Sequence, residues 1–348
     1  MTEAAFISSR PHLKVDGEER EDMQAALTAM VVNLPLHGCG HAELHLTNWG
    51  RPEGEEDPDF VFNDIGLGSE CELLMGEENP VSVFIGEITA IEERYGEGAP
   101  FLALLLQDKL HRLARSRNSR TFEDQSPDDV VRAIVSDAGL SADVSVSNLV
   151  STWHQLNESD LAFLQRLLSR FDIAVRLEGN QLRAKPEQAD SDAIEIDAQD
   201  SALRVRLLVD LNHQWLNSTV QGYNMADAVE VTHTSASMTP APDATTARIT
   251  LNELSWPGDE VMPQPFARSS AEAQAYAKAH FRRQAKRFIQ GDIVCQGEAS
   301  LKSGREIDLA GVSPRLLGKY QIVHCVHQFD NNSGFETHLK VNRADWQV

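Results

Sequence analysis

The sequence lacks any apolar run of the roughly 20 residues that a membrane-spanning helix requires. Its N-terminus lacks the basic start and apolar stretch of a secretion signal, so we expect the chain to be made and folded in the cytoplasm. Cysteine is scarce: Cys39, Cys71, Cys295 and Cys325 lie far apart and form no CxxC pair. This spacing argues against a redox motif or a paired zinc site.

Basic residues are also in short supply. Lys and Arg together number 31 against 53 Asp and Glu, which gives a formal net charge of -22. A chain this acidic repels polyanions, whereas non-specific binding to nucleic acid requires a surplus of Lys and Arg. Neither nucleic acid nor an anionic membrane surface is therefore an expected partner.

Signatures of catalysis are missing too. The sequence contains no GxSxG, no GxxxxGK[ST] and no GxGxxG motif. Carboxylates are so numerous that pairs of them indicate nothing. We therefore predict no enzyme activity, no catalytic residue and no cofactor.

One segment, HGCGHAELH, offers ligands that suit zinc, namely His37, Cys39, His41 and His45. This segment, however, also shows the usual alternation of apolar and polar residues in a β-strand, with Ala42, Leu44 and Leu46 facing inward and the polar residues facing out. We predict no metal site. A metal- or carboxylate-dependent hydrolase built on these four residues is the alternative function. His327 shares a strand face with Cys325, and we expect it to be packed or hydrogen-bonded rather than a ligand.

Two similar β-meanders lie near the ends of the chain. GSECELLMG, VSVFIGEITAIEERY and FLALLLQD cover residues 68–108, and GREIDLAG, LLGKYQIVHCVHQF and FETHLKVNR cover residues 304–343. The glycine that opens each meander, Gly68 or Gly304, is followed by a similar strand, and Ile85-Gly86 resembles Leu317-Gly318. Strand patterns broken by Gly, Pro and Asn predict antiparallel sheets. The shared order suggests one β-module used twice.

Helical patterns lie between the meanders. Ser126 and Pro127 begin a predicted helix that Gly139 ends. Asn157 is the predicted cap of a second amphipathic helix, which precedes a hairpin turning at residues 178–180. Ser269 or Ser270 begins a long third helix. The acidic stretch 187–201 is expected to be a surface connection.

Basic residues concentrate in two places. KLHRLARSRNSR, residues 109–120, could bind an anion or an acidic partner. The long third helix carries Lys278, Arg282, Arg283, Lys286 and Arg287. This cluster is expected to be a solvated face, with an acidic neighbour as the alternative.

The segment QLNESDLAFLQRLLSRFDIAVRLEGNQL resembles the helix-hairpin signature of the phage late control protein D family. These are baseplate hub proteins of contractile tails, and the hub part of type VI secretion spike proteins is similar. The resemblance extends over about residues 65 to 345. It includes FIGEITAIEERY, the segment from LLLQDKLHRLARS to VSDAGL, and KYQIVHCVHQFDNNSGFETHLKVNR. Within this family, the sequence is most similar to hubs of extracellular contractile injection systems.

The resemblance implies an α+β, mainly β fold with two similar β-barrel domains and inserted helix-hairpin segments. It implies a first, tube-type barrel at residues 1–110, an α/β insert at 111–200, a second barrel at 201–230 and 291–348, and an irregular segment with a long helix at 231–290. It also implies a homotrimer whose six barrels adapt a hexameric inner tube to a trimeric spike.

The expected partners are the spike or needle protein, the inner tube or tube-initiator protein and the baseplate wedge proteins. The expected location is the baseplate of the assembled phage tail or injection particle. Related fused proteins continue into a further barrel and needle, but this sequence stops at Val348. The spike is therefore expected to be another polypeptide, unless the chain is trimmed. A secreted effector or adhesin remains a third reading.

Overall fold

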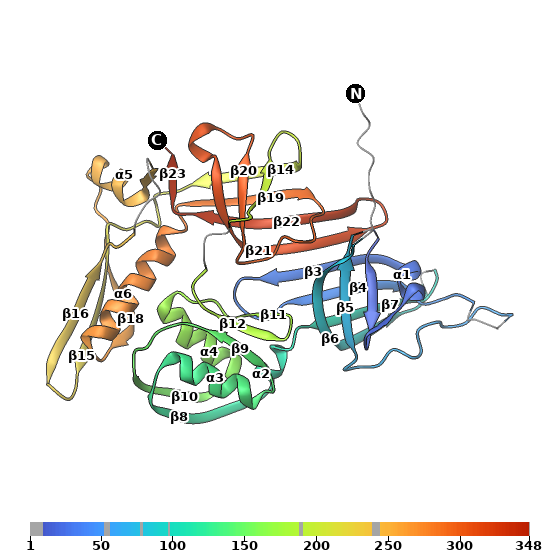
Figure 1. Ribbon diagram of the computed structural model, residues 1–348, viewed down its shortest axis with the longest axis horizontal. Coiled ribbons are helices and arrows are strands. Elements are labelled where there is room, and N and C mark those ends of the chain that lie inside the picture. The colour runs from blue at the N-terminus through green and yellow to red at the C-terminus, as the bar shows by residue number, and fades with distance from the viewer. Residues whose placement is uncertain are drawn as a thin grey trace.

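The computed structural model describes residues 10–51, 56–76, 79–96, 98–187, 191–238 and 244–347 (Figure 1). Most of the chain is β-strand, and the largest unit is one long sheet with strands from both ends of the sequence. The predicted class, mainly β with helices, is confirmed at this level. Within the described residues, no helix is both long enough and apolar enough to span a membrane.

The N-terminal half of the long sheet is called the first module here. It consists of β1 (His12–Val15), β2 (Glu18–Glu19), α1 (Glu21–Ala26), β3 (Leu27–Pro35), β4 (His41–Thr47), β5 (Glu70–Met75), β6 (Val81–Arg94) and β7 (Phe101–Gln107). Its strands lie in the order β3-β4-β7-β6-β5-β1-β2, and neighbours are antiparallel. The first predicted meander is therefore confirmed as β5, β6 and β7.

The C-terminal half is called the second module. It consists of β13 (Ile194–Asp197), β14 (Ala202–Val209), β19 (Ile289–Gln296), β20 (Glu306–Ala310), η2 (Pro314–Leu316), β21 (Gly318–Asp330) and β22 (Gly334–Arg343). Its strands lie in the order β14-β19-β22-β21-β20-β13. The second meander is thereby confirmed. The acidic stretch expected to be only a connection contains β13, which pairs with β20, because Ile194 and Ile196 alternate with acidic residues.

The two modules join through β21 and β3, which lie side by side in Figure 1. β21 is long enough to pair with β20 near its start and with β3 over the rest of its length. Cys325 lies opposite Leu34 in this antiparallel junction. A single chain thus continues one sheet across two modules.

The modules share their strand order and their local irregularities. β3, β4, β7, β6 and β5 of the first module match β14, β19, β22, β21 and β20 of the second in order. One β-bulge follows Ile88 in β6 and the matching Ile322 in β21. Another follows Leu27 in β3 and Ala202 in β14. Because bulges are specific local features, their shared positions support an internal repeat.

The glycines that open the two meanders have the same backbone role. Gly68 and Gly304 have φ angles of +90° and +86°, a region that favours glycine. Their N–H groups donate to the carbonyl oxygens of Ile88 and Ile322, both at 2.8 Å. These positions therefore correspond, as the sequence comparison predicted.

The second predicted match between the meanders is wrong in register. Gly86 lies opposite Cys71 in the first module, whereas Gly318 lies opposite Leu309, the residue that corresponds to Leu73. The two glycines are therefore two positions apart. An apolar residue followed by glycine is too short a match to define register, which the backbone pairing sets instead.

The chain between the modules forms an α/β insert. It consists of α2 (His111–Arg115), β8 (Arg117–Gln125), α3 (Pro127–Asp137), β9 (Ser141–Val144), β10 (Ser151–Ser159), α4 (Asp160–Leu168), η1 (Ser169–Phe171), β11 (Arg176–Glu178) and β12 (Gln181–Ala184). β11 and β12 are the predicted hairpin, and β12 also pairs with β9 in parallel.

The starts of α3 and α4 are set by side-chain caps. Ser126 caps α3 as predicted, and its hydroxyl accepts a hydrogen bond from the Asp129 N–H at 3.2 Å. The predicted cap of α4 at Asn157 is wrong. Pairing with β8 extends β10 through Asn157, and the hydroxyl of Ser159 accepts from the Ala162 N–H at 3.2 Å.

A further group of elements is called the α6 unit. It consists of β15 (Asn217–Asn224), β16 (Val229–Ser235), β17 (Ala244–Thr246), α5 (Ala247–Leu254), β18 (Asp259–Ala267), α6 (Ser270–Ala285) and β23 (Asp345–Gln347). Its helix α6 lies beside the insert, whereas α5 and β23 lie near the second module (Figure 1). Ser269 caps α6, which confirms that predicted start.

Two expectations for this region need correction. The segment 231–290, expected to be irregular before its long helix, contains most of β16 and all of α5 and β18. β15 was assigned to the second barrel, but it pairs with β16 and β18 in a separate sheet. Pro263 and Pro265 obscured β18 in the sequence; they are tolerated because this strand lies at a sheet edge.

The apolar core divides along the same lines. Each module has its own cluster, and Leu34 packs against both at the junction. The third large cluster combines the insert with β15, β16, β18 and α6, for example Leu164 and Phe171 with Tyr276. The insert and these four elements therefore share one core next to the sheet. Ala247 of α5 and Trp346 of β23 pack in the cluster of the second module instead.

His327 of β21 is fully buried and hydrogen-bonded, as expected from the sequence. Its Nε2 lies 3.0 Å from the carbonyl oxygen of Leu301, and its Nδ1 lies 3.0 Å from the hydroxyl of Thr337. Burial lowers the pKa of His327 to about 4. The folded protein therefore holds this ring neutral at pH values where the unfolded chain would protonate it.

We predict that this histidine makes stability fall with acidification. Since its folded pKa lies below the unfolded value of about 6.5, the stability that wild type has over H327Q should shrink by about 2 kcal/mol between pH 7 and pH 5. Urea unfolding at the two pH values measures this difference. H41Q, which alters an exposed histidine, is the control. An H327Q difference independent of pH would contradict the account.

Candidate functional site

The four residues considered as zinc ligands do not converge. His37 lies with Asp172 and Arg283 near the α6 unit, whereas His45 on β4 lies 2.5 Å from Glu43. The predicted strand alternation is confirmed, because Ala42, Leu44 and Leu46 are buried. In the described part of the chain, no group of three His, Cys, Asp or Glu side chains could hold a metal ion. The hydrolase alternative has no support there.

Cys39 instead takes part in a hydrogen-bond network with Asp108 and the backbone before α2. Its Sγ donates to Oδ1 of Asp108 at 3.0 Å, and the other carboxylate oxygen accepts from the Gly40 N–H at 2.6 Å. Oδ1 also accepts from the N–H of Leu110 at 2.9 Å. Burial raises the pKa values of both Asp108 and Cys39. A thiol held protonated in this way is a poor nucleophile or metal ligand.

The basic run at residues 109–120 is largely paired within the chain. Lys109 forms an ion pair with Glu70 at 2.7 Å, Arg112 pairs with Glu87, and Arg120 pairs with Asp160 at 2.7 Å. These contacts tie the insert to the first module and tie β8 to α4. The basic run therefore has a structural role in these contacts.

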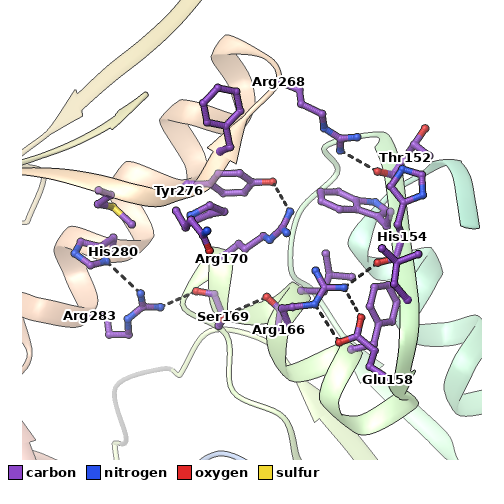
Figure 2. A pocket seen from close by; sticks show the side chains of 18 residues that line it. Thr152, His154, Glu158, Arg166, Ser169, Arg170, Arg268, Tyr276, His280 and Arg283 are labelled. Carbon is purple, nitrogen blue, oxygen red and sulfur yellow. Dashed lines mark hydrogen bonds and ion pairs between the residues drawn. The ribbon is translucent and has the colours of Figure 1, made fainter. Parts of the chain in front are cut away.

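A large cleft lies between the insert and the α6 unit, with a volume of about 770 Å³ (Figure 2). Its walls come from β10, α4 and η1 on one side and from β18 and α6 on the other. The residues that matter here are Thr152, Trp153, His154, Leu156, Glu158, Arg166, Arg170, Phe266, Arg268, Tyr276, His280 and Arg283. It is therefore built from segments far apart in the sequence.

Two of the four arginines in the cleft have carboxylate partners. Arg166 pairs with Glu158 at 2.5 Å and donates to the carbonyl oxygen of His154 at 2.8 Å. Arg268 pairs with Glu272 at 3.0 Å and donates to the carbonyl oxygen of Thr152 at 2.9 Å. Arginine side chains thus cover the outer backbone of β10.

The other two arginines contact a hydroxyl, a carbonyl and an imidazole. Arg170 lies 3.5 Å from the hydroxyl of Tyr276, and Arg283 donates to the carbonyl oxygen of Ser169 at 2.7 Å, as Figure 2 shows. Arg283 also lies 3.2 Å from Nδ1 of His280. Among the residues that the structure describes, neither Arg170 nor Arg283 forms an ion pair with a carboxylate. The cleft can therefore attract negative charge.

Glu272 links the chain segments at the end of this cleft where Thr152 and Arg268 lie. Its carboxylate is almost fully buried and accepts from the Arg268 N–H at 2.7 Å and from the Ser151 hydroxyl at 2.8 Å. It therefore joins the start of β10, the chain after β18 and the start of α6.

Sequence reasoning found only part of this cleft. It singled out the basic side of the third helix, which includes Arg283, and the helix-hairpin text, which includes Arg170. It missed the contribution of β18, because that region was read as irregular. No sequence signal indicated that Trp153 and Tyr276 would face the same arginine.

Two open strand edges occur in the long sheet, one on β14 at its end and one on part of β6 within it. β14 pairs with β19 on one side, and no described strand pairs with its other side. The end of β6 beyond Ile88 pairs with β7 on one side and with no described strand on the other. Leu203 and Leu208 of β14 are half exposed. Open edges with exposed apolar residues are typical of strand-pairing interfaces.

Comparison with solved structures defines the class of fold. The 43 kDa tail protein of prophage MuSo2 from Shewanella oneidensis aligns with a TM-score of 0.72 and 12% identity, covering 97% of this chain and 99% of that chain. A tail protein from Neisseria meningitidis MC58 aligns with a TM-score of 0.67 and 10% identity, covering 97% of each chain. The fold is that of phage tail proteins.

A type VI secretion protein shares this fold. The E. coli c3393 protein, described as a component of that system, aligns with a TM-score of 0.57 and 12% identity, covering 95% of this chain and 76% of that one. The resemblance to the tail-hub family drawn from the sequence is confirmed.

The family of the chain follows from its sequence. The family model described as the Alg8 N-terminal domain matches residues 13–331, and the chain belongs to this family. No curated protein matches the sequence.

We predict that Glu272 is needed for stability of the cleft. E272Q keeps the shape but removes a charge that satisfies several buried donors, so the free energy of unfolding should fall by about 2 to 4 kcal/mol. Urea denaturation measures the change, and E253Q on the exposed side of α5 is the control. Equal stabilities of the two variants would contradict the role assigned to Glu272.

Proposed function

We propose that this chain is the structural baseplate hub of a contractile phage tail or contractile injection system, acting as a homotrimer. The tail-protein fold supports the general role, and the repeated module supports the trimer. A trimer with two similar modules per chain presents six equivalent units to a hexameric tube while keeping threefold symmetry toward a spike. The repeat is the single observation that carries this proposal.

The junction inside the chain supplies a template for the contact between chains. Within one chain, β3 of the first module pairs with β21 of the second. β14 corresponds to β3, and β6 corresponds to β21. The open edge of β14 would therefore pair with the open end of β6 in a neighbouring copy, closing the sheet around the trimer.

The equivalence also predicts the register of that contact. Cys325 lies opposite Leu34 within the chain, and these positions correspond to Ile91 and Val209. Ile91 lies at the edge of the first apolar cluster and Val209 at the edge of the second. Pairing them would connect the clusters of two chains as Leu34 connects those within one chain.

Charged residues on the two edges act in both directions on this pairing. β14 carries Arg204 and Arg206 on its exposed side, whereas β6 ends with Glu92 and Glu93. In the predicted register, which follows the pairing of Gln328 with Val31, Arg206 lies directly opposite Arg94 of the neighbouring copy and diagonally across from Glu92. The first contact opposes the pairing and the second favours it. Cross-strand pairs of opposite charge stabilise a sheet by a few tenths of a kcal/mol to about 1 kcal/mol each.

In this proposal the two modules are the two barrel domains, and the insert and the α6 unit lie outside the ring that they form. The chain holds the spike and transmits force during contraction, with no chemical step of its own. Its partners are the spike or needle protein, the inner tube or tube-initiator protein and the wedge proteins. It acts in the baseplate of the assembled particle.

We expect the purified protein to be trimeric. Multi-angle light scattering at micromolar concentration should give three times the 38.6 kDa mass of one chain. Burial of six strand edges and their apolar residues is the physical reason. A single species with the mass of one chain would contradict the proposal.

We also expect a disulfide to form only in the predicted register. Glu92 and Leu208 correspond to Val326 and Asn33, which lie directly opposite each other. Opposed residues on neighbouring strands have Cα atoms about 4.5 to 5.5 Å apart, which a disulfide can bridge. Oxidised E92C/L208C should therefore run as a covalent trimer on non-reducing gels.

The matched control for this experiment is E93C/L208C. Its two thiols would lie on opposite faces of the joined sheet, so it should remain monomeric on the gel. Equal cross-linking of both variants, or of neither, would contradict the register. A trimer that fails to cross-link would leave the hub role standing and overturn this interface alone.

A further inference from the structure

The cleft between the insert and the α6 unit concentrates positive charge in a strongly acidic chain. Arg170 and Arg283 both line it, and neither has a carboxylate partner among the described residues. The chain as a whole has 53 acidic residues and a net charge of -22. Arginines left without acid partners in such a chain therefore mark a place where an external carboxylate would be favoured.

The guanidinium group of Arg170 is held by aromatic rings. It lies over the ring of Trp153 at 5.9 Å and over the ring of Tyr276 at 5.7 Å. Arg268 lies over the same Trp153 ring at 5.8 Å. Cation–π contacts fix the arginine side chains without neutralising them. This lowers the entropy cost of binding a carboxylate.

The rim of the cleft offers apolar contacts. Leu156 on β10 is 72% exposed, and Phe266 on β18 is 60% exposed. Both line the cleft. An aromatic or aliphatic residue of a bound chain would cover these side chains while its acidic residues reach the arginines.

Binding here would use side chains and not strand addition. The carbonyl oxygens of Thr152 and His154 already accept hydrogen bonds from Arg268 and Arg166. In β18, Pro263 and Pro265 have no N–H to donate. The specificity of the cleft therefore lies in its charge and its apolar rim.

We infer that this cleft binds an acidic polypeptide segment that also carries an apolar side chain, supplied by a partner protein of the assembly. Its carboxylates bind Arg170 and Arg283, and its apolar residue packs on Phe266 and Leu156. This site is formed by residues of one chain, and its Arg283 also lines a second pocket that includes Arg206 and Leu208 of β14. A polypeptide fits better than a nucleic acid, because the surrounding charge repels an extended polyanion.

The test uses the full chain and a fluorescein-labelled peptide with the sequence EDEFEDE. Fluorescence anisotropy should show saturable binding to wild type that weakens as salt rises. R170Q/R283Q should bind at least about tenfold more weakly, because both charged contacts to the peptide carboxylates are lost. R170K/R283K keeps the charges and should retain binding, which separates loss of charge from misfolding.

Two controls make the result specific. R282Q removes the neighbouring arginine, an exposed residue of α6 outside the cleft lining, and should bind like wild type. The same peptide with Lys in place of each acidic residue should not bind. Thermal melting of each variant shows whether it is folded.

Three outcomes would overturn the inference. One is that the acidic peptide shows no binding to wild-type protein at a protein concentration of 1 mM, which is far above the dissociation constant of a useful site. Another is equal binding by wild type and folded R170Q/R283Q. The third is tighter binding of a ten-nucleotide oligothymidylate than of the peptide, which would assign the cleft to nucleic acid.

Discussion

Backbone pairing at strand edges is the constraint on which this structure depends. An unpaired row of N–H and C=O groups must be covered or paired, and the chain does so internally by joining β3 to β21. The same solution is not available within one chain for β14 and the end of β6, whose outer edges have no described partner. A closed ring of copies satisfies both edges with a contact that the chain already makes once.

The rest of the fold is arranged around this sheet. The insert enters after β7, and all of the α6 unit except β23 lies between β14 and β19 in the chain. The insert nevertheless shares one apolar core with β15, β16, β18 and α6. Ion pairs such as Lys109 with Glu70 tie that outer body to the first module. The arginine-lined cleft lies within the outer body, and Arg283 is the cleft residue that also lines a pocket with Arg206 and Leu208 of β14.

The sequence allowed the meanders, the capped helices and the repeat to be predicted, because these depend on local periodicity and on residues such as Ser126 and Gly304. The register of the repeat could not be predicted, because Gly86 and Gly318 look equivalent in sequence but are two positions apart in the structure. The edge strand β18 could not be predicted either, because Pro263 and Pro265 are unusual in strands. The cleft was also hidden, because Trp153, Arg170 and Tyr276 are brought together only by tertiary packing. Long-range pairing decides such features, and local patterns do not record it.

The central claim is that a repeated module lets three chains form a ring with six similar units. Electron microscopy of the purified protein with two-dimensional class averages tests it most directly. The account predicts ring-shaped particles with a threefold outer outline and six similar inner lobes. Compact single-chain particles, or rings with another number of inner lobes, would contradict it.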